Sequence, residues 1–312
     1  MNILLYRDLP ASAADEVRAI APHAQVRIDA RPAELPSHLP WADAIFGNPP
    51  ASALLTAPRL RWLQIVSSGI DEYHALTDSG IQVTTAHGIH APTIAQHTLM
   101  TILMLARAQL HFTLRQHEAR WDRSPSLLED VRGQTVGFIG YGAVGRELVH
   151  SVAVLGMRAR AVKRTPALCP PELEQLDTLA GLDDLLAASD HIVISLPLTA
   201  ETRGLLDAAR IACIKRGACL HNIARGGLLD EEAVRARLLD GSLRGAAMDV
   251  FATEPLPSSS PWWATPNCIV TPHLAGHHSA LGRLAFERFL RNLARHLAGD
   301  SLVGEANFAR QY

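Results

Sequence analysis

The chain has 312 residues, enough for two domains of average size. Lys plus Arg number 29 and Asp plus Glu number 31, so the formal net charge is −2 at pH 7. This balance gives no electrostatic case for binding nucleic acid or an anionic membrane, and we expect neither as a partner. Hydrophobic residues make up 48% of the chain and charged residues 19%, a composition typical of a globular protein.

Three residue types, lysine, cysteine and histidine, narrow the possible chemistry. Lys163 and Lys215 are the only lysines and no GxxxxGK[ST] sequence occurs, which argues against a lysine nucleophile and a P-loop. The four cysteines form no CxxC pair, the N-terminus does not resemble a signal peptide and no apolar run is long enough to span a bilayer. We therefore predict a reduced, cytoplasmic protein. The 15 histidines show no zinc-site spacing, so we expect no metal site.

The first 90 residues alternate between short apolar runs and helical patterns. The predicted strands are 2–6, 44–46, 62–66 and 81–84, with an amphipathic helix at 11–20. From Thr93 to about Ala119 the pattern predicts one long helix without Gly or Pro. Its apolar side chains are Leu99, Met100, Ile102, Leu103 and Leu105. They could face the core or a subunit interface, and we favour the core.

A second alternating block follows this helix. We predict strands at 136–139, 159–162, 191–195, 218–222, 245–250 and 268–271, and helices at 143–155, 182–188 and 231–239. A final helix at 281–297 could pack back on the first domain. The βαβ rhythm predicts an α/β fold with two doubly wound parallel sheets.

A glycine-rich turn follows the predicted strand 136–139. It is the GxGxxG sequence Gly140, Tyr141, Gly142, Ala143, Val144 and Gly145. Because it lies between a strand and a helix, the motif predicts a dinucleotide-binding turn rather than a purely structural one. The first glycine permits the tight turn, the second lets the backbone approach a pyrophosphate, and the third allows close packing.

The strand 159–162 should end in an acidic residue if the ribose 2′-hydroxyl of NAD is bound there. The sequence instead has Lys163, Arg164 and Thr165. Two cations and a hydroxyl suit a 2′-phosphate, so NADP(H) is the preferred cofactor and NAD(H) remains possible. The alternative is that these are solvated loop residues with little effect on preference.

Three further motifs follow predicted strands, in the order N-x-A-R-G-G at 222–227, D-V-F-x-x-E-P-L at 249–256 and T-P-H-x-A-G at 271–276. With the glycine-rich turn, they resemble those of the D-isomer-specific 2-hydroxyacid dehydrogenase family over nearly the full chain. The resemblance implies a Rossmann cofactor domain, 95–279, inserted into a flavodoxin-like substrate domain, 1–94 plus 280–312.

The resemblance also implies three catalytic residues. Arg225 matches the family's substrate-binding arginine, and Glu254 and His273 match its carboxylate–histidine pair. A guanidinium can hold the carboxylate and polarise the carbonyl of a 2-keto acid. His273 would protonate the alkoxide that forms on reduction, with Glu254 orienting the ring. The alternative for His273 is a structural histidine.

Other positions carry binding roles by the same resemblance. Asp249 matches a contact to the nicotinamide carboxamide, and Ala224 belongs with the cofactor-binding residues. Leu196 and Pro197 match the wall of the adenosine pocket, although plain loop packing explains them nearly as well. Ser68 and Gly69 match a loop whose amides receive the substrate carboxylate; an ordinary strand-to-helix turn is the alternative. His277 could line the substrate pocket.

These features predict an NADPH-dependent reductase of a small 2-keto acid, with the D-2-hydroxy acid as product. The segment Val303 to Tyr312 is similar to the tails of some glyoxylate/hydroxypyruvate reductases, so glyoxylate or hydroxypyruvate is the leading substrate class. The alternative is a corepressor-like binding protein that senses dinucleotides on the same fold. The resemblance further implies a homodimer formed through the cofactor domain.

Overall fold

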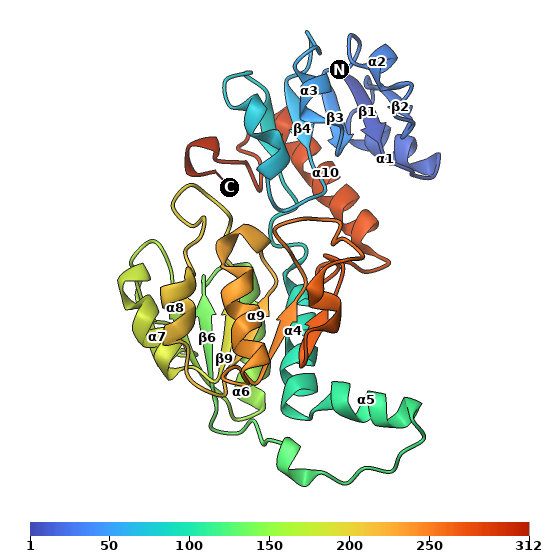
Figure 1. Ribbon diagram of the computed structural model, residues 1–312. Coiled ribbons are helices and arrows are strands. Elements are labelled where there is room, and N and C mark those ends of the chain that lie inside the picture. Colours follow the sequence, from blue (N-terminus) through green and yellow to red (C-terminus); the bar gives the residue numbers. More distant parts are fainter. Residues whose placement is uncertain (312) are drawn as a thin grey trace. The chain divides into compact units, whose positions relative to one another are not determined.

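The computed structural model describes residues 1–311. The chain forms two compact units (Figure 1). Unit 1 comprises Met1–His90 and the C-terminal residues 278–311, and unit 2 comprises Ala91–His277. Tyr312, the last residue of the predicted tail, lies outside the described residues. The domain boundaries expected from the sequence, between residues 94 and 95 and between residues 279 and 280, stay a prediction.

Unit 1 contains a five-stranded parallel sheet with the order β2-β1-β3-β4-β5. This is the flavodoxin-like strand order, and the expected fold class is confirmed. The strands are β1 (Asn2–Tyr6), β2 (Gln25–Ile28), β3 (Ala44–Gly47), β4 (Trp62–Gln64) and β5 (Gln82–Thr84). The helices are α1 (Ser12–Ile20), α2 (Leu35–His38), α3 (Ala51–Leu54) and α10 (Leu281–Ala298).

The helix α10 packs back on the first sheet, as expected for the final helix of the chain. Phe286 and Phe289 are buried against Phe46 of β3, with ring centroids 5.6 and 5.1 Å from that ring. Phe289 also stacks on Trp62 of β4 at 5.1 Å. The last helix of the chain therefore completes the core of unit 1. It ends at Ala298 and is followed by Gly299, which adopts the left-handed conformation common after helices.

Unit 2 contains a seven-stranded parallel sheet with the order β12-β11-β10-β9-β6-β7-β8, the doubly wound order of a dinucleotide-binding domain. The strands are β6 (Thr135–Ile139), β7 (Arg158–Val162), β8 (Gln175–Asp177), β9 (His191–Ile194), β10 (Cys219–Asn222), β11 (Gly245–Met248) and β12 (Cys268–Val270). The helices are α4 (Ala91–Ala106), α5 (Gln109–His117), α6 (Ala143–Val154), α7 (Leu182–Ala188), α8 (Ala208–Cys213) and α9 (Glu231–Leu239).

The prediction of one helix from Thr93 to about Ala119 is wrong. The chain breaks between α4 and α5 at Ala108, which has a left-handed φ of 50°. The carbonyl of Ala106 accepts a 2.8 Å hydrogen bond from the distant amide of Glu129. A tertiary contact therefore takes an acceptor that a continuous helix would use. Within residues 1–311, no helix has both the length and the apolarity that crossing a membrane requires.

The apolar side chains of α4 divide between core and surface. Ile102 and Leu105 are buried, and Leu99 and Leu103 pack partly buried against the core. Met100 is exposed. Core packing, the favoured interpretation, thus accounts for most of this face.

Two edge strands, β2 and β8, were not predicted. None of the residues in either strand is fully buried. An edge strand has little apolar signal because one side has no neighbour and its side chains stay near solvent. The other two edge strands, β5 and β12, were predicted, and each of them has buried residues.

Candidate active site

The turn between β6 and α6 has the geometry of a phosphate-binding loop. Gly140 has a φ of +95°, which only glycine adopts readily. A Cβ added to Gly142 would have no atom within 4 Å, so the backbone there borders open space. Helix α6 begins with no side-chain cap on its first amides. These amides and the partial positive charge of the helix end suit a pyrophosphate.

The side chains around this turn serve mainly to pack it. Tyr141 is buried in the core beside Phe138, and a Cβ on Gly145 would lie 2.8 Å from the Tyr141 ring. Gly145 therefore makes room for the tyrosine ring, and a dinucleotide contact at Tyr141 would use its backbone. Leu196 is also buried against the turn, whereas Pro197 is exposed.

The segment after β7 presents the predicted cations at the surface. The Lys163 amide donates to the carbonyl of Asp177, which aligns β7 with β8. The Arg164 guanidinium lies 3.5 Å from the carboxylate of Glu201, and Thr165 is exposed. No acidic residue follows β7 directly, so the position that binds a ribose 2′-hydroxyl in NAD enzymes is occupied by Lys163.

His273 and Glu254 form the pair that the sequence predicted. His273 Nδ1 lies 2.8 Å from Glu254 Oε2. The other Glu254 oxygen, Oε1, accepts a 2.9 Å hydrogen bond from the amide of Phe251, which fixes the carboxylate. Among the residues of unit 2, no hydrogen bond engages Nε2 of His273, and the side chain is 47% exposed, so this nitrogen is available to a reacting group.

The loop that carries His273 is held by Asp249 at the end of β11. Asp249 Oδ1 accepts hydrogen bonds from the hydroxyl of Thr271 (2.5 Å) and the amide of Leu274 (2.9 Å), and Oδ2 accepts one from the amide of Ala275 (3.0 Å). His273 itself has a φ of +56°, which is uncommon for a residue with a Cβ. The carboxylate is thus engaged as a loop anchor. A contact between Asp249 and a nicotinamide stays a prediction.

Arg225 lies on the turn after β10, beside the turn after β11. The buried Asn222 organises this turn, since its side chain donates to the Arg225 carbonyl at 3.0 Å and accepts from the Ala224 amide at 3.2 Å. A Cβ on Gly226 would lie 2.0 Å from the carbonyl carbon of Phe251. Only glycine therefore lets the two turns approach this closely, which brings Arg225 near the segment that carries Glu254. The motif contains Asn222, but no feature of the motif predicted that its side chain organises the turn.

In unit 1, the loop after β4 holds the residues predicted to bind substrate. Ser68 is exposed and Gly69 is half-buried. Asn48, which follows β3, accepts a 2.8 Å hydrogen bond from the Val66 amide and donates to the Ser67 hydroxyl at 3.2 Å. Asn48 was missed because a single Asn after a strand has no distinctive signal. The role of Ser68 and Gly69 stays a prediction.

Two histidines of the second sheet, His191 in β9 and His221 in β10, form a buried hydrogen-bonded chain with Thr101 and Gln134. Thr101 Oγ1 lies 2.9 Å from His221 Nδ1, His221 Nε2 lies 3.1 Å from His191 Nδ1, and His191 Nε2 lies 3.0 Å from Gln134 Oε1. Burial lowers the pKa of His191 to about 4 and lowers that of His221 as well. These two are neutral core histidines. In the described part of the chain, no three His, Cys, Asp or Glu side chains are grouped to hold a metal ion.

This geometry defines a class of protein. A doubly wound sheet with an open glycine turn, together with a histidine–carboxylate pair at the carboxyl ends of its strands, is typical of dinucleotide-dependent oxidoreductases. Residues 99–275 match the family model described as D-isomer specific 2-hydroxyacid dehydrogenase, NAD binding domain. The chain belongs to the D-isomer-specific 2-hydroxyacid dehydrogenase family, a family of oxidoreductases.

Known relatives agree with this membership. The chain is 35% identical over 262 residues to D-3-phosphoglycerate dehydrogenase of Mycobacterium bovis, covering 82% of this chain but 49% of that protein. It therefore spans about half the length of that relative. It is 32% identical over 290 residues to glyoxylate/hydroxypyruvate reductase B of Pectobacterium carotovorum, covering 88% and 87% of the two chains. A D-isomer specific 2-hydroxyacid dehydrogenase from Xanthobacter autotrophicus, solved with NADPH and MES, is 30% identical with a TM-score of 0.83 and covers 100% of this chain and 99% of its own.

Proposed function

We propose that this protein reduces a small 2-keto acid of the glyoxylate or hydroxypyruvate type to the D-2-hydroxy acid, with NADPH as the preferred reductant. The observation that carries the proposal is the 2.8 Å pair of His273 and Glu254 on a loop anchored by Asp249. The similarity to a glyoxylate/hydroxypyruvate reductase, over 88% of this chain and 87% of that protein, supports the choice of substrate. The cytoplasmic location stays a prediction.

The residues of the β6–α6 turn fit a dinucleotide. The open space over Gly142 and the uncapped start of α6 would receive the pyrophosphate, with the backbone from Gly140 to Gly145 around it. When bound, the reduced nicotinamide supplies a hydride to the carbonyl carbon of the substrate. The other cofactor residues predicted from the sequence are Leu196, Pro197 and Ala224. They follow β9 and β10 and would line the cofactor at the same carboxyl edge of the sheet.

The chain's own residues supply binding and a proton. Arg225 offers a planar pair of N–H groups for the substrate carboxylate and carbonyl oxygen. His273 in its charged form donates the Nε2 proton to the oxygen that becomes the hydroxyl, and Glu254 at Nδ1 holds the ring in the required orientation. In the oxidative direction the same nitrogen takes the proton back. Ser68 and Gly69 would supply further hydrogen bonds to the substrate carboxylate.

The preference for NADPH is proposed on charge. Lys163, Arg164 and Thr165 offer two cations and a hydroxyl after β7, which suit a 2′-phosphate. Binding would draw Arg164 away from Glu201 or share it between the two anions. The bound NADPH in the Xanthobacter relative supports this proposal.

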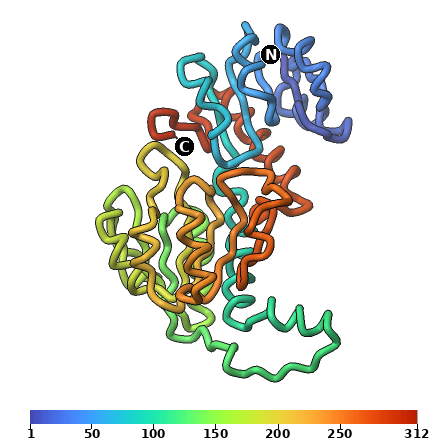
Figure 2. Tube along the Cα trace, viewed as in Figure 1, coloured from blue at the N-terminus to red at the C-terminus, as the bar shows by residue number. Residues whose placement is uncertain are grey.

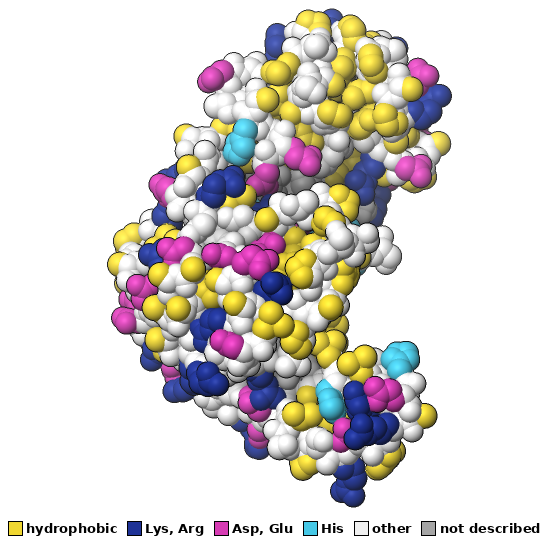
Figure 3. Space-filling model, viewed as in Figure 1, with side chains coloured by type: hydrophobic (Ala, Val, Ile, Leu, Met, Phe, Trp, Pro, Cys, Tyr) yellow, Lys and Arg dark blue, Asp and Glu magenta, His cyan; other side chains and the backbone are white. Residues whose placement is uncertain are grey.

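We further propose a homodimer formed through unit 2. Helix α5 and the chain that follows it extend away from the sheet of unit 2 (Figures 1 and 2), and no residue of α5 is buried. In this segment Trp121 is 92% exposed and Leu114 is 58% exposed. Its surface carries apolar, basic and histidine side chains (Figure 3). A second copy would bury these apolar groups. Light scattering should give twice the chain mass, and Trp121→Ser should shift it toward the monomer; a monomeric wild type contradicts the dimer.

The activity is tested by steady-state reduction of a panel of 2-keto acids, each with NADPH and NADH. We expect the highest kcat/KM for glyoxylate or hydroxypyruvate, D-configured product where the product is chiral, and a higher kcat/KM with NADPH than with NADH. The variant Lys163→Ser/Arg164→Ser should lose this preference by weakening NADPH use alone. Absence of turnover on every acid would favour the dinucleotide-binding alternative, and equal or better use of NADH would overturn the cofactor preference.

A further inference from the structure

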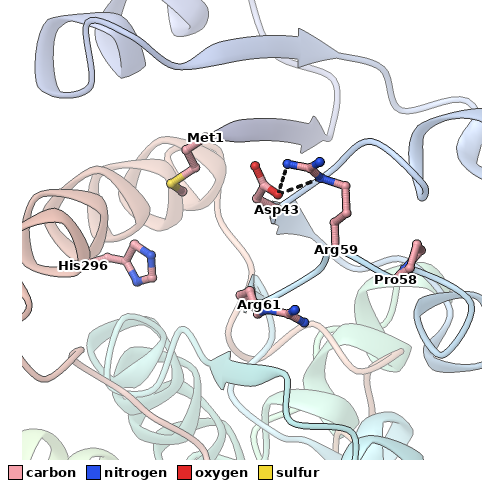
Figure 4. Close-up of a pocket in the computed structure, with 6 residues that line it drawn as sticks. All are labelled: Met1, Asp43, Pro58, Arg59, Arg61 and His296. Carbon is pink, nitrogen blue, oxygen red and sulfur yellow. Dashed lines mark hydrogen bonds and ion pairs between the residues drawn. The ribbon is translucent and has the colours of Figure 1, made fainter.

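The amino ends of the strands of unit 1 border a hollow that the catalytic proposal does not use. Its volume is about 520 Å³, and it is lined by Met1, Asp43, Pro58, Arg59, Arg61 and His296 (Figure 4). Asp43 directly precedes β3 and Arg61 directly precedes β4, whereas Ser68 and Gly69 follow β4. The hollow therefore lies at the sheet edge opposite the predicted substrate loop.

The charged side chains of this hollow are unbalanced. Arg59 pairs with Asp43, with Nε and Nη2 both 3.0 Å from Oδ1. Arg61 has no carboxylate partner among residues 1–311; its recorded side-chain hydrogen bond is a long one, 3.4 Å, to the carbonyl of Leu60. His296 adds an imidazole from α10. One carboxylate thus faces two guanidinium groups and a histidine, which favours an anionic ligand.

Two groups of the hollow, the His296 ring and the Asp43 carboxylate, are held in place, and the backbone of Arg61 is tied to the sheet. The Arg61 amide donates to the Asp43 carbonyl, and its carbonyl accepts from the Gln82 amide, both at 2.9 Å. The His296 ring stacks on the buried Trp62 at 5.3 Å with an interplanar angle of 17°. Asp43 Oδ2 accepts the Asn2 amide at 2.8 Å, so the carboxylate that orients Arg59 is itself fixed. The His296 imidazole is therefore positioned before a ligand arrives, and a donor that is already fixed loses less entropy on binding.

We propose that this hollow is a binding site for a phosphate-bearing small molecule, with Arg61 and His296 as its principal donors and Arg59 as a second cation. A guanidinium presents a planar fork that matches two oxygens of a phosphate, and an imidazole N–H supplies a third hydrogen bond. The volume is within the range of small-molecule sites. The site is independent of the proposed reductase activity, because the residues that carry that activity lie in unit 2 and in the loop after β4.

The test uses isothermal titration of the full chain with inorganic phosphate and with pyrophosphate, in the presence of saturating NADP⁺ to occupy the dinucleotide turn. We expect saturable binding of pyrophosphate, and Arg61→Gln should weaken it about tenfold or more. Arg291→Gln is the matched control, since Arg291 is an exposed arginine of unit 1 that does not line the hollow, and it should leave the affinity unchanged.

A second variant should change the affinity for pyrophosphate in the opposite direction. Asp43→Asn removes the negative charge that holds Arg59, so it should tighten pyrophosphate binding. Thermal unfolding of each variant verifies that the fold is retained. Wild-type protein that does not bind either anion at millimolar concentration, or an Arg61→Gln variant that binds as wild type does, overturns the proposal. An Asp43→Asn variant with weakened binding would also contradict it.

Discussion

The backbone amide of His273 donates a 2.8 Å hydrogen bond to the backbone carbonyl of Asp249. The next two amides of the same loop, at Leu274 and Ala275, donate to the carboxylate of Asp249. One residue at the end of β11 therefore holds three successive amides, and the loop passes through a left-handed φ at His273. The position of His273 is therefore set by the backbone carbonyl and carboxylate of Asp249, in addition to the contact between its ring and Glu254.

The first prediction is that Asp249→Asn lowers kcat by about ten- to a hundredfold, because a small displacement of a catalytic group has effects of this size. An Asn side chain presents one NH₂ group where the loop amides need acceptors. The dissociation constant of NADPH, measured by fluorescence titration, should change little by comparison.

Thr271→Val is the matched control for this prediction. It removes one hydrogen bond to Asp249 Oδ1 and leaves both amide bonds, so its effect on kcat should be only a few-fold. If Asp249→Asn instead keeps kcat and weakens only NADPH binding, then Asp249 acts as the nicotinamide contact that the family resemblance implied.

The second prediction concerns the pair itself. His273→Gln should lower kcat by roughly 10²- to 10⁴-fold, the usual range for loss of a general acid, while NADPH binding is retained. Glu254→Gln should have a smaller effect, about ten- to a hundredfold, because it acts through the orientation of the ring. The double variant should be no slower than His273→Gln alone. Near-normal turnover of His273→Gln would show that the histidine is structural.

Much of this site could be predicted because its signals are local. A glycine turn between a strand and a helix, and polar motifs directly after apolar strands, depend on residues close together in the chain. Parallel strands then bring these segments to one edge of the sheet. The pairing of Glu254 with His273 followed from the resemblance, and the structure has the two groups in contact.

The features that could not be predicted depend on contacts between residues that are distant in the sequence. The break at Ala108 follows from the amide of Glu129, 23 residues away from the carbonyl of Ala106 that it binds. The anchoring role of Asp249 requires a loop 22 to 26 positions later in the chain. Asn48 likewise organises a loop 18 positions away. No periodicity or spacing in the sequence encodes such partners.

The third prediction separates cofactor binding from folding at glycine positions. Gly142→Ala places a Cβ in open space at a φ that alanine accepts, so the melting temperature should stay near that of the wild type. The same Cβ would occupy the room that a pyrophosphate needs, so NADPH affinity should fall about tenfold or more.

Gly226→Ala is the contrasting variant, since its Cβ would lie 2.0 Å from the Phe251 carbonyl carbon and 2.1 Å from the Ala252 nitrogen. Backbone must move to admit it, and we expect a loss of about 1–3 kcal/mol or more in the free energy of unfolding. If Gly142→Ala binds NADPH as the wild type does, the turn is structural and does not receive the pyrophosphate.

The last prediction follows from the buried histidines of unit 2. Burial lowers the pKa of His191 to about 4 and also lowers those of His221 and His97, whereas an unfolded chain has histidine pKa values near 6.5. Above pH 6.5 these histidines are neutral in both the folded and the unfolded chain, so they do not make the free energy of unfolding depend on pH. As the pH falls from 6.5 toward 4, the unfolded chain takes up protons that the folded chain does not. The free energy of unfolding should therefore fall, by up to about 1.4 kcal/mol per pH unit for each such histidine.

Urea unfolding of the full chain at pH 7.5, 6.0 and 5.0 measures this dependence. His191→Gln should flatten it, because one buried site no longer differs in proton binding and the Gln amide can still donate to Gln134 Oε1, the acceptor 3.0 Å from His191. His117→Gln, on the exposed face of α5, should leave the dependence as in the wild type. A wild-type stability that stays level from pH 6.5 to 5 would mean that the histidine chain opens to solvent and takes up protons in the folded protein.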